Sequence, residues 1–283
     1  MSDQGKYYQS SDDLRLFYRD VGAGHTATPV LCLPGLTRNS RDFEDLAAYI
    51  AHSRRVVCPD FRGRGFSEHD SDWRNYHPHT YVNDIWRLLD HLGIERTIVV
   101  GTSLGGLCAV TMAGAHPERL AGVVMNDIGP EINPAGIARI QSYTGTQEDV
   151  ASWDEAIAQA REAYEFGLPG LSDEFWARFV RRSYRENADG TPKLDMDPGI
   201  GTAVRKLGPV MADPWQLFDA LADIPVTIIR GMLSDILTTD ITDKMQARLP
   251  HIHVVHVPNR GHVPLLDEPE SLTAIDNLLK DVA

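Results

Sequence analysis

The chain has 283 residues, of which 42% are hydrophobic, and its formal net charge at pH 7 is −13. This length suits one large domain, or one domain that carries an insertion. The acidic balance argues against nucleic acid or an anionic membrane as a partner, because both need a basic surface.

The first residues of the chain are polar, and no apolar run follows that could serve as a signal peptide or a membrane span. We therefore expect a cytoplasmic protein. Its three cysteines are Cys32, Cys58 and Cys108. An odd, scattered set is typical of buried thiols in a reducing compartment and not of disulfides, and no pair has the spacing of metal ligands. Neither a metal nor a cofactor is expected.

Short apolar runs alternate with helix-like segments along most of the chain. Strands are predicted at residues 14–19, 30–33, 55–58, 97–100, 121–126, 226–230 and 253–257, and helices at 43–52, 80–92, 104–115, 240–249 and 270–282. This alternation predicts an α/β fold, with a mostly parallel central sheet and helices on both faces. Ligands of such folds bind beyond the carboxyl ends of the strands.

The alternation stops between about residue 129 and residue 214. No convincing buried strand occurs there, and aromatic residues follow helical patterns: Tyr143, Trp153, Tyr164, Phe166, Phe175, Trp176, Phe179 and Tyr184. We therefore divide the chain into a first core part (1–128), a helical lid insertion (129–214) and a second core part (215–283). Hinges are expected at residues 129–130 and 208–209. The aromatic residues either form the lid's own core or line a substrate pocket.

A serine lies between two glycines in Gly101-Thr102-Ser103-Leu104-Gly105, where a predicted strand meets a predicted helix. In this setting Gly-x-Ser-x-Gly indicates a nucleophile elbow, a sharp turn that lifts the hydroxyl above the edge of the sheet. The free N–H groups at the start of the helix would face any developing anion. We predict that Ser103 is a nucleophile; the alternative is a flexible loop.

A serine nucleophile needs a general base and a carboxylate that orients the base. His262 is the candidate base, because it lies in a Gly-His loop after the last predicted strand. Asp235 is the preferred acid, because it follows the strand at 226–230 and gives the order Ser103, Asp235, His262 along the chain. Asp127, directly after the strand at 121–126, is the rival acid; otherwise it is a hinge to the lid or a hydrogen-bonding neighbour of His262.

An oxyanion hole needs two backbone N–H groups. We predict that Leu104, directly after the nucleophile, and Leu36, one residue past Gly35 in the loop after the strand at 30–33, supply them. Arg38 lies two residues beyond Leu36. It is either a surface ion-pair partner or a ligand for a substrate carboxylate.

Together these motifs resemble the α/β-hydrolase superfamily, of the lidded serine esterase, lactonase and C–C hydrolase type, over almost the whole chain. Residues 59–67 (PDFRGRGFS) resemble the family's P-D-x-R-G-x-G-x-S segment, while Pro34-Gly35 stands where the family often has His-Gly. The resemblance implies hydrolysis of a small carboxylic ester or lactone through an acyl-enzyme, with a small-molecule substrate as the partner. The alternatives are C–C bond hydrolysis of a vinylogous diketone acid, with the same triad, and ligand binding on a hydrolase scaffold without turnover.

Overall fold

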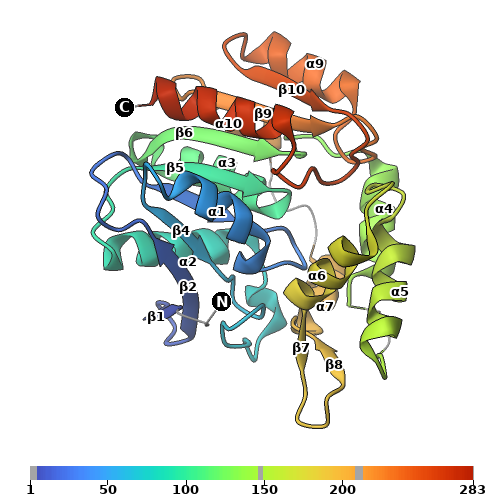
Figure 1. The fold of residues 1–283 in the computed structure, drawn as a ribbon. Helices are drawn as coiled ribbons and strands as arrows, with labels where there is room; N and C mark the ends of the chain where they lie inside the picture. Colours follow the sequence, from blue (N-terminus) through green and yellow to red (C-terminus); the bar gives the residue numbers. More distant parts are fainter. Residues whose placement is uncertain (1–4, 146–148, 208–212, 283) are drawn as a thin grey trace.

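A central sheet organises the computed structural model, which describes residues 5–145, 149–207 and 213–282 (Figure 1). In sheet order its strands are β1 (Lys6–Gln9), β2 (Arg15–Val21), β4 (Val56–Pro59), β3 (Val30–Leu33), β5 (Thr97–Thr102), β6 (Leu120–Asn126), β9 (Val226–Gly231) and β10 (His253–Val257). The β1–β2 and β2–β4 pairs are antiparallel, and every pair from β4 to β10 is parallel. The predicted fold class is confirmed.

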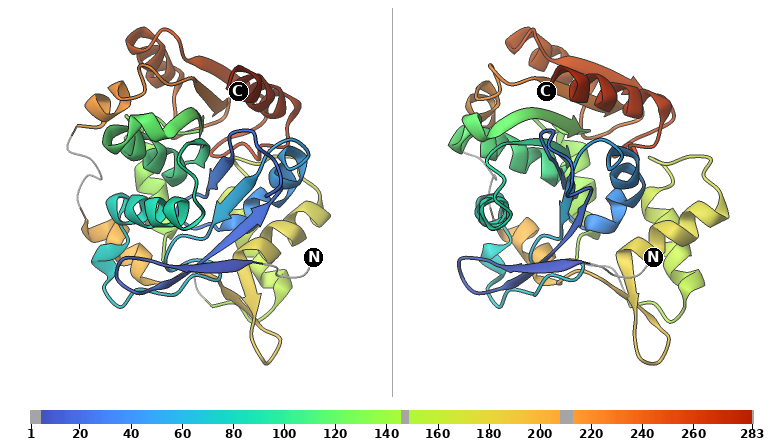
Figure 2. Two further views of the ribbon diagram at one scale, coloured as in Figure 1. Left: turned by 90° about the vertical axis from the view of Figure 1, so that its left-hand side faces the viewer. Right: turned by 60° about the vertical axis from the view of Figure 1, so that its left-hand side comes forward.

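Helices cover both faces of the sheet, as Figure 2 shows. One face packs against α1 (Glu44–Ile50) and α10 (Pro269–Asp281), and the other against α2 (Pro78–His91), α3 (Leu104–Ala115), α8 (Pro214–Asp219) and α9 (Thr239–Arg248). Within the described residues, three short 3₁₀ helices join the larger elements: η1 (Ser40–Phe43), η2 (Trp73–Asn75) and η3 (Pro117–Arg119).

The central strands are buried on both faces, which explains their unbroken apolar sequences. Every residue of β3, β4 and β6 is buried, and so are the first five of β5. Side chains alternate between the two helical layers, so that Leu31 packs in one layer and Cys32 in the other. The three cysteines are free and buried, as expected.

The segment between β6 and α8 interrupts the alternation of strands and helices, and we call residues 129–214 the helical insertion. Its described helices are α4 (Pro134–Tyr143), α5 (Trp153–Tyr164), α6 (Asp173–Ser183) and α7 (Gly199–Lys206). It also contains a short antiparallel pair, β7 (Tyr184–Glu186) with β8 (Pro192–Leu194), which the sequence analysis did not predict. Of the expected hinges, residues 208–209 lie outside the described residues.

The helical insertion lies beside the edge of the sheet at which β5 and β6 end (Figure 1). It has a small core of its own, centred on Trp176, Ala156 and Val180. The carboxyl ends of the parallel strands therefore face a separate helical layer, and a site at this edge has walls from both. Among the described helices, none is long and apolar enough to cross a membrane.

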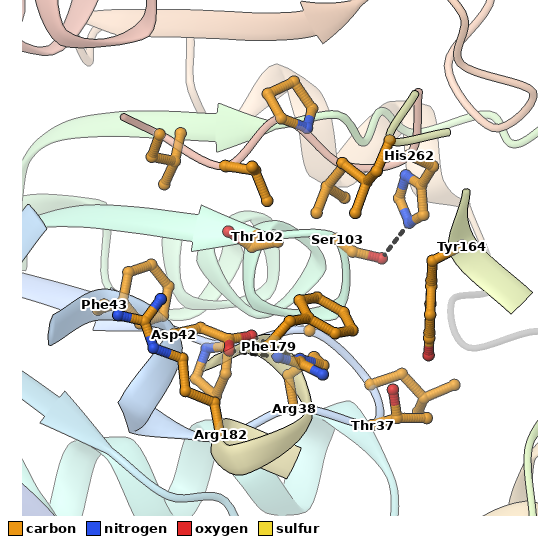
Figure 3. Close-up of a pocket in the computed structure, with 18 of the residues that line it drawn as sticks. Thr37, Arg38, Asp42, Phe43, Thr102, Ser103, Tyr164, Phe179, Arg182 and His262 are labelled. Atoms are coloured by element: carbon orange, nitrogen blue, oxygen red, sulfur yellow. Dashed lines mark hydrogen bonds and ion pairs between the residues drawn. The ribbon is translucent and has the colours of Figure 1, made fainter. Parts of the chain in front are cut away.

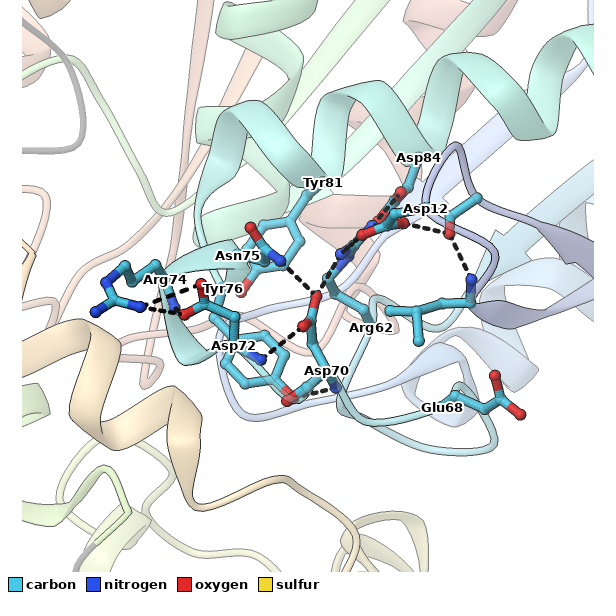
Figure 4. Close-up of polar contacts among 12 residues, drawn as sticks. Asp12, Arg62, Glu68, Asp70, Asp72, Arg74, Asn75, Tyr76, Tyr81 and Asp84 are labelled. Carbon is cyan, nitrogen blue, oxygen red and sulfur yellow. Dashed lines mark hydrogen bonds and ion pairs between the residues drawn. The ribbon is translucent and has the colours of Figure 1, made fainter.

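A buried arginine fixes the loop after β4 (Figure 4). The Arg62 guanidinium is 1% exposed and donates hydrogen bonds to the carboxylates of Asp84, Asp12 and Asp70, at 2.6 to 3.0 Å. Because several carboxylates neutralise the charge and accept its protons, burial of this arginine is compensated. The loop that carries residues 59–67 is thereby held against α2.

Candidate active site

The serine turn lies where β5 meets α3, and its backbone is strained. Ser103 has φ of 51° and ψ of −111°, a conformation that L-residues rarely adopt. A Cβ atom on Gly105 would lie 2.1 Å from the Leu33 carbonyl oxygen, and one on Gly101 would lie 2.4 Å from the Gly105 oxygen. Only glycine permits so close an approach of strand and helix. The predicted elbow geometry is therefore present.

A continuous chain of hydrogen bonds joins Ser103, His262 and Asp127. His262 Nε2 lies 2.9 Å from Ser103 Oγ, and His262 Nδ1 lies 2.8 Å from Asp127 Oδ2. A carboxylate only accepts, so Nδ1 carries the proton that faces Asp127 and Nε2 is left free to accept from the serine hydroxyl. The imidazole is therefore oriented as a base toward Ser103. The His262 side chain is 8% exposed and that of Asp127 is fully buried.

The carboxylate of Asp127 is fixed from the neighbouring strand. Its Oδ1 accepts from the backbone N–H of Gly231 at 2.9 Å, and its Oδ2 accepts from the hydroxyl of Ser234 at 2.5 Å. The backbone N–H of Asp127 donates to the Ile229 carbonyl at 2.7 Å, and its φ of 55° turns the chain sharply after β6. These hydrogen bonds compensate for the burial of the carboxylate and hold it in place.

The preference for Asp235 as the partner of His262 is wrong. Its carboxylate forms a two-pronged ion pair with Arg139 on α4, with N–O distances of 2.5 and 2.8 Å. Burial alone would raise the pKa of Asp235, but the hydrogen bonds and charge of Arg139 hold it below its ordinary value. β6 and β9 are neighbours in the sheet and end at the same edge, so either aspartate starts within reach of this region. The turn after β6 brings Asp127 to the histidine, while Arg139 binds Asp235.

The loop after β3 lies against the elbow. A Cβ atom on Gly35 would lie 3.9 Å from Ser103 Cβ, and Leu36 lines the same pocket as Ser103. Leu104 is the first residue of α3, so its N–H has no acceptor within the helix. Both predicted donors therefore border the serine, and their role toward an oxyanion stays a prediction.

A pocket of about 1190 Å³, counted out to its open mouth, leads to Ser103 and His262. Figure 3 shows these two residues on one side, with Tyr164, Phe179 and Arg38 across from them. The aromatic residues that the helical insertion contributes to the wall are Tyr143, Tyr164, Phe175 and Phe179. Trp176 is instead fully buried within the insertion, and Trp153 stacks on Arg181. Both roles considered for the aromatic residues are therefore filled, and Tyr164, Phe175 and Phe179 serve both, because they also pack against the core of the insertion.

Arg38 is an ion-pair partner, as one of the two expectations had it, but it lies in the pocket wall and not on the open surface. Its side chain is 12% exposed and donates twice to Asp42, at 2.6 and 2.7 Å. It also donates to Ser183 and stacks on Phe179, with its guanidinium carbon 4.0 Å from the ring centre. Arg38 therefore ties the loop after β3 to α6.

A model of the alpha/beta hydrolase fold matches residues 28–269 of this chain. The chain belongs to the α/β-hydrolase fold family. Its curated relatives include the 3-hydroxybutyrate-oligomer hydrolase of Cupriavidus necator, which is 32% identical over 91% of this chain and 90% of the relative. The 2-(acetamidomethylene)succinate hydrolase of Mesorhizobium japonicum is 28% identical over 94% of this chain and 92% of the relative.

A solved α/β-hydrolase from Novosphingobium aromaticivorans superposes on the chain with a TM-score of 0.93. The two are 42% identical, and the match covers 99% of this chain and 98% of the other. Proteins that match nearly the whole length of this chain are hydrolases. This α/β-hydrolase therefore has the general activity of a hydrolase.

Several residues of the site carried no local signal in the sequence of this α/β-hydrolase. Ser234 is one residue from Asp235, yet its hydroxyl binds Asp127, 107 positions earlier. The pocket aromatics of the insertion lie on three different helices, and only their helical spacing pointed to a buried face. Among the described residues, no group of three or more His, Cys, Asp or Glu side chains converges as a metal site would.

Proposed function

We propose that the chain is a serine hydrolase that cleaves a small carboxylic ester or lactone through an acyl-enzyme intermediate. The hydrogen-bonded chain of Ser103, His262 and Asp127 carries the proposal, because it opens directly onto a pocket whose wall includes apolar and aromatic side chains beside charged ones. A nucleophile, a base and an orienting carboxylate at these distances are the requirements of acyl transfer.

In the first step His262 Nε2 takes the hydroxyl proton as Ser103 Oγ attacks the carbonyl carbon. The π electrons of the carbonyl move to its oxygen, and the N–H groups of Leu36 and Leu104 are proposed to stabilise the oxyanion. Asp127 stabilises the imidazolium that forms, and its hydrogen bond prevents the ring from turning away.

In the second step the oxyanion collapses, and the bond between the carbonyl carbon and the alkoxy oxygen breaks. His262 gives its proton to the leaving alcohol, which leaves Ser103 acylated. A water molecule then repeats the attack with His262 as base, and breakdown of the second intermediate releases the acid and restores the serine. A lactone reacts in the same way, with its alcohol and acid parts in one product.

We propose that the helical insertion is a lid that sets substrate choice. Tyr143, Tyr164, Phe175 and Phe179 supply an apolar wall opposite the nucleophile, which favours acyl or alcohol groups of limited size. Similarity to a 3-hydroxybutyrate-oligomer hydrolase makes short esters of hydroxy acids the first substrates to test.

Labelling with a fluorophosphonate, read by peptide mass spectrometry, tests the nucleophile, with Ser103→Ala as the control. Turnover of p-nitrophenyl acetate, a γ-lactone and a dimer of 3-hydroxybutyrate then tests the substrate class. We expect labelling at Ser103 alone and turnover of at least one ester or lactone. Labelling without turnover of any of these, with cleavage of a vinylogous diketone acid, would assign C–C hydrolysis instead. Labelling with no turnover at all would indicate a binding protein.

A further inference from the structure

Arg64 is buried behind the loop that carries Leu36. The Arg64 side chain is 0% exposed, and its Nε donates to the Leu36 carbonyl oxygen at 2.8 Å. Its Nη1 donates to the Arg62 carbonyl oxygen and to the Tyr81 hydroxyl oxygen, both at 2.9 Å. One rigid guanidinium therefore joins the loop after β3, the loop after β4 and helix α2.

The charge of Arg64 is not neutralised, which distinguishes it from Arg62 two positions earlier. Within the described parts of the chain, no carboxylate forms an ion pair with Arg64, whereas three do so with Arg62. Arg64 Nη2 is buried and has no hydrogen-bond partner among the described residues. Aromatic rings surround the group instead, and its carbon lies 4.9 Å from the centre of the Tyr81 ring.

An unneutralised buried cation is costly, so its retention needs a reason. The surroundings supply one, because the guanidinium lies between two elements that meet at the nucleophile. It binds the Leu36 carbonyl on one side. On the other side it binds the Tyr81 hydroxyl on α2, and α2 packs against α3, the helix that begins directly after Ser103.

We propose that Arg64 is a positioning residue for the oxyanion hole, and this inference rests on the proposed function. Its bond to the Leu36 carbonyl restrains the peptide plane that follows Leu36, and the Arg38 N–H bond to the Gly35 carbonyl restrains the preceding plane, which contains the Leu36 N–H. Its unneutralised charge adds a positive potential at the place where the carbonyl oxygen of the substrate becomes negative. Such groups act on the transition state more than on the bound ester, because the charge develops only there.

Arg64→Met tests both contributions, because methionine fills similar space without charge or donors. We expect kcat for p-nitrophenyl acetate to fall about 10- to 100-fold and KM to change less than about threefold, as for a misplaced oxyanion donor. Affinity for a trifluoromethyl ketone, which forms an oxyanion adduct with the serine, should fall by the same factor. Affinity for the matching methyl ketone should not change.

Arg64→Lys keeps a buried charge but cannot reach all three acceptors, and we expect a smaller loss of about 3- to 10-fold in kcat. Asp12→Asn is the matched control, because it loosens the same loop through Arg62 alone and should leave kcat unchanged per folded molecule. Circular dichroism and thermal melting establish that each variant is folded before its kinetics are compared.

A folded Arg64→Met protein with wild-type kcat and wild-type trifluoromethyl ketone affinity overturns the inference. If the methionine variant does not fold, wild-type values for Arg64→Lys overturn it equally, because lysine cannot reproduce the bond geometry. An equal loss of kcat in Asp12→Asn also refutes a specific role. Failure of wild-type protein to react with the fluorophosphonate at Ser103 refutes the proposed function instead, so the two failures are distinguishable.

Discussion

Replacing Asp127 with asparagine is expected to abolish most of the activity without removing the nucleophile. An asparagine amide offers hydrogens to His262 Nδ1, which turns that nitrogen into an acceptor and moves the ring proton to Nε2. The ring then donates toward Ser103 and cannot take its proton. The Asp127 Oδ2 to His262 Nδ1 distance of 2.8 Å leaves no space for a water molecule to restore the original tautomer.

The expected loss is about 10⁴-fold in kcat, the effect of a wrong imidazole tautomer in a serine triad. At about 1.36 kcal/mol for each factor of ten, this corresponds to about 5 kcal/mol of transition-state stabilisation. Asp235→Asn is the matched control. It removes the ion pair with Arg139, whose two side chains are 32% and 27% exposed, and such a pair contributes about 1 kcal/mol or less to stability. We expect its kcat to change less than about tenfold.

Initial rates with p-nitrophenyl acetate, measured on both variants and the wild type at one pH, decide between the two aspartates. The fluorophosphonate-reactive fraction corrects each rate for active-site content, and thermal melting shows that both variants are folded. A greater loss in Asp235→Asn than in Asp127→Asn would refute the assignment of Asp127. Nearly equal losses would mean that both carboxylates act on His262 as one network.

Ser103→Ala should fold normally and keep less than about a thousandth of the wild-type rate of ester hydrolysis; more than a tenth would contradict the nucleophile assignment. Phe179→Ala should change the ratio of kcat/KM for butyrate and acetate esters about 3- to 30-fold, because its ring forms part of the pocket wall. Trp176→Ala should instead lower the free energy of unfolding by about 3 to 5 kcal/mol and leave that ratio alone, and the reverse pattern would count against the lid proposal. Hydrogen bonds from Arg62 lower the pKa of Asp12 from 3.8 to about 2, so the folded state binds this proton less readily than the unfolded state. The excess stability of the wild type over Asp12→Asn, measured by urea unfolding, should therefore be complete above about pH 5 and shrink as the pH falls toward about 2; a difference that does not change with pH would contradict the lowered pKa of Asp12.

Local patterns in the sequence were enough for the elements of the core. Buried parallel strands have continuous apolar sequences, and the helices between them have apolar residues that recur with the helical period. Both could therefore be located without knowledge of their neighbours. The sequence did not predict strand β1, because its residues, Lys6-Tyr7-Tyr8-Gln9, are largely polar and exposed. The sequence did not predict the β7–β8 pair either, because strands of three residues are too short to show an alternation of apolar and polar side chains. Both are strands only because a partner pairs with them.

The sequence by itself also determined the elbow and the histidine, because each depends on residues within a few positions. Glycines on both sides of Ser103 are required wherever a strand and a helix approach to within van der Waals contact. The choice of acid depended instead on the tertiary structure. Asp127 and Asp235 are 108 positions apart in sequence, but they follow adjacent strands, β6 and β9, which end at the same edge of the sheet. The sharp turn at Asp127, the hydroxyl of Ser234 and the guanidinium of Arg139 decided between them, and only folding brings these three groups to the same place.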